Sequence, residues 1–190
     1  IIGGWVAIQG LSAWKQQLRG QVEYDLARRL LLSLLKYRDA VSGVRVSTMW
    51  ANEMPKPPDD ELELMNDHEA RFYGMAKAYQ ARWDRVQLQR SNLYADLLES
   101  EVIWGDELKQ LSNVLFALEG ELYSAVHNHL EVTNPNNSQR KKDAIQKIID
   151  KKRDVLYDDR SETDEFNIEF KRGMKAMESY IKPKLAHSKK

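Results

Sequence analysis

His127 and His129, followed closely by Glu131, form the one compact histidine cluster in this 190-residue sequence. A zinc or di-iron site on a helix needs ligands three or four positions apart, as in a Glu-x-x-His motif. Residues two positions apart on a helix point about 200° away from each other, so the two imidazoles face opposite sides. No Glu-x-x-His motif occurs in the sequence. We therefore interpret both histidines as surface residues near a helix end, and we expect neither a metal ion nor a cofactor.

Glu99 and Glu101 lie beside a short apolar run that ends at the next predicted helix boundary. A carboxylate buried there could have a raised pKa and act as a general acid or base. The alternative is an ion pair between helices with Arg82, Arg85 or Arg90. We favour the ion pair, because charges of both signs are interleaved along this part of the chain.

Arginines on the predicted helices could also line a pocket for an anion. The candidates are Arg28, Arg29, Arg71, Arg82, Arg85 and Arg90. Acidic residues are interspersed on the same helices, which favours solvated charge pairs. No phosphate-binding loop, dinucleotide fingerprint or Ser-His-Asp pattern is present, and the chain has no cysteine. We can name no catalytic residue, and we expect a protein that is not an enzyme.

Charge and length place further bounds on function. Lys and Arg together number 29, as do Asp and Glu, so the formal net charge is zero. A general nucleic-acid-binding protein would show a basic excess, and we expect no nucleic-acid partner. The length fits one domain, or one domain with an anchor.

Residues 1–14 contain no charged side chain, whereas Lys15 and Arg19 follow directly. A helix needs about 20 apolar residues to cross a bilayer, so this run can only be the C-terminal part of a span. Trp14 suits a membrane interface, and the two cations match the positive-inside pattern. We expect a single-pass protein of the inner (cytoplasmic) membrane with residues 15–185 on the cytoplasmic side. The alternative is a buried N-terminal core helix.

An apolar stripe at three- and four-residue spacing continues this segment as one helix, which we expect to end near Gly43. Its members are Trp14, Leu18, Val22, Leu26, Leu30, Leu34 and Tyr37. Small residues four apart, Gly3 and Ala7, allow close approach of helices in lipid. We therefore predict an assembly interface between copies of the chain. Its residues are Gly3, Ala7, Leu18, Val22, Leu26 and Leu30.

The remainder of the chain reads as further helices separated by turns. Pro55, Pro57 and Pro58 mark residues 51–60 as a linker. The predicted helices after it cover residues 59–104, 108–131, 138–153 and 161–185. Ser161 and Asp164 resemble a capping box, and residues 186–190 are expected to be a disordered tail. The pattern predicts an all-α fold, an elongated antiparallel bundle of about five helices.

The predicted helix over residues 138–153 is strongly basic, with seven Lys or Arg and two Asp. Such a helix could lie on anionic lipid. The acidic stretch over residues 154–165 could instead neutralise it within the protein, and we favour this second interpretation.

Several segments resemble a family of uncharacterised bacterial proteins with one N-terminal transmembrane helix and a cytoplasmic helical domain. They are Gly-Leu-Ser-x-Trp-Lys-x-Gln-Leu-Arg-Gly at 10–20, Glu-Tyr-Asp-Leu-Ala-Arg-Arg-Leu-Leu at 23–31, Ala-Tyr-Gln-Ala-Arg-Trp at 78–83, Glu-Val-Ile-Trp-Gly at 101–105 and Tyr-Ile-Lys-Pro at 180–183. The resemblance implies a membrane anchor ahead of Ile1, but no activity, substrate or catalytic residue.

Two hypotheses for function follow. The first is a membrane-anchored helical protein that acts by self-assembly or by binding a protein partner. The second is a ligand-sensing or enzymatic bundle with a pocket between its helices. A pocket lined by convergent charged residues would favour the second, and a large apolar face between subunits would favour the first.

Overall fold

The computed structural model describes the backbone of residues 2–158 and 161–186 and the side chains of residues 14–158 and 161–186. Within these ranges the regular structure is entirely helical. The helices are α1 (Ile2–Val44), the 3₁₀ helix η1 (Ala51–Glu53), α2 (Asp59–Leu62), α3 (Asp67–Trp104), α4 (Glu107–Thr133), α5 (Gln139–Ile149) and α6 (Glu165–Ala186). The predicted all-α bundle is confirmed.

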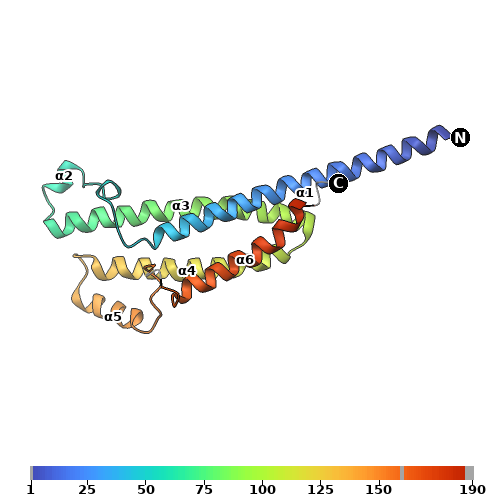
Figure 1. The fold of residues 1–190 in the computed structure, drawn as a ribbon. Coiled ribbons are helices and arrows are strands. Elements are labelled where there is room, and N and C mark those ends of the chain that lie inside the picture. Colours follow the sequence, from blue (N-terminus) through green and yellow to red (C-terminus); the bar gives the residue numbers. More distant parts are fainter. Residues whose placement is uncertain (1, 159–160, 187–190) are drawn as a thin grey trace.

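Four long helices, α1, α3, α4 and α6, run in alternating directions and form the body of the molecule (Figure 1). Both α3 and α6 pack against α1 and against α4, so α1 and α4 lie diagonally across the bundle. The short helix α5 packs on α4. The N-terminal part of α1 projects beyond the other helices, and α2 lies at the opposite end (Figure 1). We call that opposite end the distal end.

The core is formed where the apolar stripes of the four long helices meet. From α1 the buried residues recur every three or four positions, starting at Leu26 and including Leu30, Leu34 and Tyr37. Matching stripes on the other helices include Trp83 and Leu93 of α3, Leu115 and Leu122 of α4, and Phe170 and Met177 of α6. Each buried leucine or phenylalanine contributes about 1.5–3 kcal/mol relative to exposure, so these stripes are the main source of stability.

Two predicted helix boundaries are correct for a local reason. The first helix ends at Val44, beside Gly43. The α3–α4 corner lies at Gly105, whose φ of 88° falls in a region that favours glycine, and its amide donates to the Glu101 carbonyl. The chain can therefore reverse direction there within two residues.

The prediction of one uninterrupted helix over residues 59–104 is wrong. Asn66 begins α3 with a capping box: its side chain accepts from the amides of His68 and Glu69, and the Glu69 carboxylate accepts from the Asn66 amide. This cap satisfies amides at the start of α3 and separates it from the four-residue helix α2. The apolar periodicity runs through both helices, which hides the break.

The last helices also differ from prediction at their ends. The α6 helix begins at Glu165, and Asp164, not Ser161, accepts from the Asn167 amide in the first turn. Pro183 lies inside α6, which ends at Ala186, one residue later than predicted. The fourth predicted helix ends at Ile149, four residues early. Residues 187–190 of the predicted tail lie outside the described residues.

No helix in the described part of the chain combines the length and apolarity that crossing a bilayer requires. The predicted end of a span over residues 1–14 lies, apart from Trp14, on side chains outside the described set. It stays a prediction.

Candidate functional site

The six residues of the predicted assembly interface divide into three groups. Gly3 and Ala7 lie among the side chains outside the described set. Leu26 and Leu30 are fully buried within the bundle of the same chain. Leu18 and Val22 are 51% and 45% exposed on the projecting part of α1. With Trp14, which is 60% exposed, they form a surface that we call the α1 stripe.

Polar residues surround the α1 stripe on the same part of α1. Arg19 donates to Glu23 one turn later at 3.0 Å, an i, i+4 pair that supports the helix. Lys15 and Gln16 are exposed beside Trp14 and Leu18. The α1 stripe is thus an apolar strip on an otherwise hydrated helix, and it continues directly into the buried stripe that starts at Leu26.

A second candidate site is a cleft of about 270 Å³ between α4, α5 and the segment that follows α5. We call it the α4–α5 cleft. Its walls include Ala125 and Val132 from α4, Ile149 from α5, and Leu156 from the following segment. Its polar lining residues are Glu121, Asn128, His129, Gln146, Lys152, Arg153 and Asp154.

His129 contributes a titratable group to the α4–α5 cleft whose pKa is altered by its surroundings. Its ring packs edge-on against Tyr79, at 5.8 Å between centroids, and against Tyr157, at 6.2 Å. Desolvation lowers the pKa of His129, and the nearby Asp154 carboxylate opposes that effect. The imidazole is therefore held toward its neutral form, in which it can donate or accept a proton.

Arg153 closes one side of the cleft by joining three elements. Its guanidinium donates to both carboxylate oxygens of Glu121 on α4, at 2.9 and 2.7 Å, and to both oxygens of Glu169 on α6, at 2.9 Å each. The hydrogen bonds from Arg153 hold the pKa of Glu169 below its usual value. These carboxylates are thus committed to structure. His129, Lys152 and Asn128 of the cleft lining make no side-chain hydrogen bond or ion pair within the described residues and are available to a ligand.

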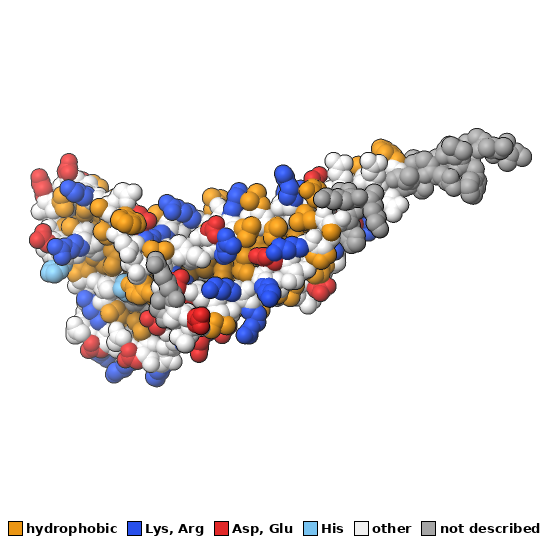
Figure 2. Space-filling view, in the orientation of Figure 1, with side chains coloured by type: hydrophobic (Ala, Val, Ile, Leu, Met, Phe, Trp, Pro, Cys, Tyr) orange, Lys and Arg blue, Asp and Glu red, His pale blue; other side chains and the backbone are white. Residues whose placement is uncertain are grey.

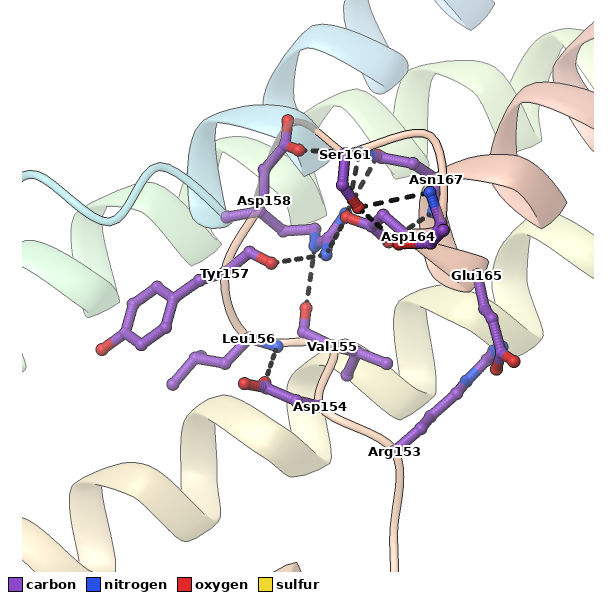
Figure 3. Close-up of polar contacts among 12 residues, drawn as sticks. Arg153, Asp154, Val155, Leu156, Tyr157, Asp158, Ser161, Asp164, Glu165 and Asn167 are labelled. Atoms are coloured by element: carbon purple, nitrogen blue, oxygen red, sulfur yellow. Dashed lines mark hydrogen bonds and ion pairs between the residues drawn. The ribbon is translucent and has the colours of Figure 1, made fainter.

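The wall formed by residues 153–157, which Figure 3 shows beside the start of α6, is held in place by Arg45, the first residue after α1. Arg45 is only 2% exposed. It donates to the carbonyls of Val155 and Tyr157 at 2.8 and 2.7 Å, and its guanidinium lies over the Phe166 ring at 4.4 Å. It also donates to Asn167 Oδ1 and Asp164 Oδ2, both at 2.9 Å. One side chain thus connects the end of α1, the segment after α5 and the start of α6.

A buried polar cluster crosses the bundle diagonally between α1 and α4. Tyr37 donates to Glu119 Oε2 at 2.7 Å, and Arg90 of α3 donates to Glu119 Oε1 at 3.1 Å. Glu119 is 2% exposed, and burial, together with the Glu119 carboxylate, raises the pKa of Tyr37. Arg90 also lies 4.8 Å from the Phe116 ring centroid. A cluster of this kind fixes the register of three helices, because a shifted packing would leave its charges unpaired.

The other residues singled out by sequence lie in ordinary structural roles. His127 stacks on Tyr123 and is exposed, on a different face from His129. Among the described residues no group of three His, Cys, Asp or Glu side chains could hold a metal ion. Glu131 pairs with Lys141, and hydrogen bonding from that lysine lowers its pKa.

The predicted ion pairs of Glu99 and Glu101 have different partners from those expected. Glu99 pairs with Arg29 on α1, and Glu101 with Lys109 on α4 at 2.7 Å. Arg82 instead binds Glu53 and two carbonyls of the segment after α1. The choice of partner depends on which helices are neighbours, which periodicity alone does not specify.

Sequence reasoning missed Arg45, Glu119 and Arg153. A signal for Arg45 was available in its position between Val44 and Val46, because a charged residue with apolar neighbours on both sides is often buried with a partner. Glu119 lies between core positions Leu118 and Leu122 on α4. Nothing in the sequence distinguishes Arg153 from the other cations around α5.

No family model, curated protein or solved structure matches this chain. The resemblance to bacterial membrane-anchored proteins therefore stays a prediction.

Proposed function

We propose that this protein is a membrane-anchored helical protein that works by self-assembly, with the projecting part of α1 joining copies of the chain. The observation that supports this proposal is the α1 stripe. Trp14, Leu18 and Val22 recur every four residues and are exposed. They lie on α1, whose N-terminal part extends past the bundle (Figure 1). Their apolar surface would be stabilised by contact with a second helix.

A second copy of the same helix fits this surface best. Two parallel copies place identical apolar residues opposite each other over the two turns from Trp14 to Val22, where the four-residue spacing keeps all three side chains within about 80° around the helix. A membrane anchor ahead of this part of α1 would hold copies parallel and raise their effective concentration. The uncharged sequence over residues 1–14 and the flanking Lys15 and Arg19 support such an anchor in the inner membrane.

The absence of native cysteine permits a direct test. Leu18→Cys should give a disulfide between copies under mild oxidation of the full chain in detergent. The matched control is Gln16→Cys, which lies two positions away and therefore about 200° around the same helix. We expect cross-linking at least about tenfold faster at position 18, because only that face lies against the partner helix.

Equal rates at the two positions, or no cross-linking at either, would refute assembly through the α1 stripe.

The membrane anchor is tested by a separate experiment. The protein expressed from its complete reading frame should sediment with membranes after a high-salt wash and be released by detergent. Recovery in the soluble fraction would overturn that part of the proposal.

A ligand-sensing role is the second candidate, and the α4–α5 cleft favours it. A small aromatic carboxylate suits its lining, because Leu156 and Ile149 offer apolar contact while His129 and Lys152 offer polar contact. Benzoate is a suitable probe, with benzyl alcohol as the neutral control. Stabilisation against heat by benzoate alone, lost in Lys152→Gln, would support this role, and no shift with either compound would exclude this class of ligand.

A further inference from the structure

The distal end of the bundle carries two surfaces of opposite charge that belong to one chain. The first is an open groove of about 670 Å³ between the start of α3, the end of α4 and the start of α5. We call it the distal groove. Its lining residues are Asn66, His68, Arg71, Phe72, Met75, Thr133, Pro135 and Lys142. The lining thus combines apolar and cationic side chains and includes no carboxylate.

The second surface is residues 59–67, which we call the acidic segment. It holds the acidic residues Asp59, Asp60, Glu61, Glu63 and Asp67 and no lysine or arginine. Leu64 within it is 86% exposed, the second-highest exposure among the large apolar side chains of the described residues. An exposed leucine among carboxylates is the complement of an apolar groove bordered by cations. Figure 2 shows acidic, basic and hydrophobic side chains together at this end of the molecule.

These opposite charges do not neutralise each other within the described part of the chain. Arg71 and Lys142 make no side-chain hydrogen bond or ion pair there, and neither do Glu61 and Glu63. By contrast, Arg29, Arg45, Arg82, Arg90 and Arg153 are all paired. The acidic segment leads directly into the capped start of α3 at Asn66, which also lines the distal groove.

We propose that the acidic segment of one copy binds the distal groove of a second copy, and that the reverse contact forms at the same time. Such a two-fold arrangement is self-complementary, since each copy supplies one acidic and one basic surface. Leu64 enters between Phe72 and Met75, and the carboxylates of Glu61 and Glu63 meet Arg71 and Lys142. The contact is separate from the α1 stripe, which lies at the other end of the molecule (Figure 1).

Distance argues against a lipid headgroup as the occupant. The 38 residues of α3 separate the distal groove from the end of the bundle where α1 projects, a length of about 57 Å at 1.5 Å per residue. If α1 enters a membrane, the distal groove lies far from that surface. Copies joined at both ends would form an extended array, because the two contacts use opposite ends of the molecule.

Charge exchange tests this contact independently of α1. All variants of the full chain carry Leu18→Glu and Val22→Glu, so that the α1 stripe makes no contribution. One variant reverses the charge of the acidic segment with Glu61→Lys and Glu63→Lys. The other reverses the charge of the distal groove with Arg71→Glu and Lys142→Glu. Mass by light scattering at low and high salt is the measurement, with circular dichroism to verify folding. Lys171→Glu with Lys175→Glu, two exposed positions on α6, is the matched control.

We expect the parent and the control to form dimers that dissociate as salt rises. Each reversed variant alone should associate at least about tenfold more weakly, because like charges then face each other. An equal mixture of the two reversed variants should regain association, because each reversed surface then meets an opposite charge on the other variant. A monomeric parent, reversed variants that still dimerise, or a mixture that stays monomeric would overturn the proposal. An acidic segment from another protein would then be the remaining occupant. Failure here leaves the cross-linking test of the α1 stripe unaffected.

Discussion

Replacing Arg45 with methionine tests whether one buried guanidinium holds the segment of residues 153–158 against the end of α1 and the start of α6. Methionine retains an unbranched apolar stem that can lie over Phe166 and removes the charged head. The substitution leaves the buried Asp164 carboxylate without its cation, and the carbonyls of Val155 and Tyr157 without their donor. Asp164 retains the Asn167 amide as a partner, so its charge stays partly compensated.

The expected loss follows from these contacts. Breaking a buried ion pair by removing one partner costs about 3–5 kcal/mol, and each carbonyl left without a donor adds up to about 1–3 kcal/mol where water cannot reach it. The contributions overlap, because the segment can relax and admit water. We therefore expect the free energy of unfolding to fall by about 3–5 kcal/mol, a large part of the 5–15 kcal/mol typical of a domain.

Urea denaturation followed by circular dichroism is the assay. Arg45→Lys should be intermediate, because an ammonium keeps the charge but cannot form the same set of hydrogen bonds. Arg85→Met, at an exposed arginine on α3, is the control and should cost less than about 0.5 kcal/mol. A cycle with Asp164→Asn should give a coupling energy of about 1–3 kcal/mol. A loss below 1 kcal/mol for Arg45→Met, or no coupling to Asp164, would refute the assigned role.

Three further predictions follow from the packing of the bundle. Gly173→Ala should destabilise the protein by about 1–3 kcal/mol in urea denaturation, because the added Cβ would lie 2.7 Å from a fully buried leucine of α4. The control Gly120→Ala has open space around its Cβ and should stabilise the protein by up to about 1 kcal/mol. Burial lowers the pKa of His129, so the unfolded chain binds more protons than the folded protein, and the free energy of unfolding should fall as pH drops below about 6.5. Denaturation curves measured above and below this pH should show a smaller difference in His129→Gln. Tyr37→Phe should cost about 1–3 kcal/mol by the same assay, since Glu119 then loses a hydrogen-bond donor in the core; equal stability would show that water replaces the hydroxyl.

The candidate surfaces could be predicted only in part. Leu18 and Val22 were identified from their spacing, but the same spacing included Leu26 and Leu30, which are core residues. The distal groove could not be predicted, since it is bounded by elements that lie apart in the sequence. The α4–α5 cleft lies between consecutive elements, but periodicity does not give the angle at which they pack. The distal groove, for example, joins Arg71 to Lys142, two residues on different helices.

The sequence by itself determined the helical class of the fold, the helix periodicity and the corner at Gly105, because these depend on residues within one or two turns of each other. Tertiary structure alone decided which part of the α1 periodicity is core and which part is surface, since that depends on how far α3 and α6 extend alongside α1. It also decided the partners of Arg45 and Glu119. Arg45 binds residues 110 to 122 positions away, and such pairings are set by the arrangement of the helices in space. A pattern that repeats every 3.6 residues gives the direction of a side chain around its own helix, but not the residue it meets.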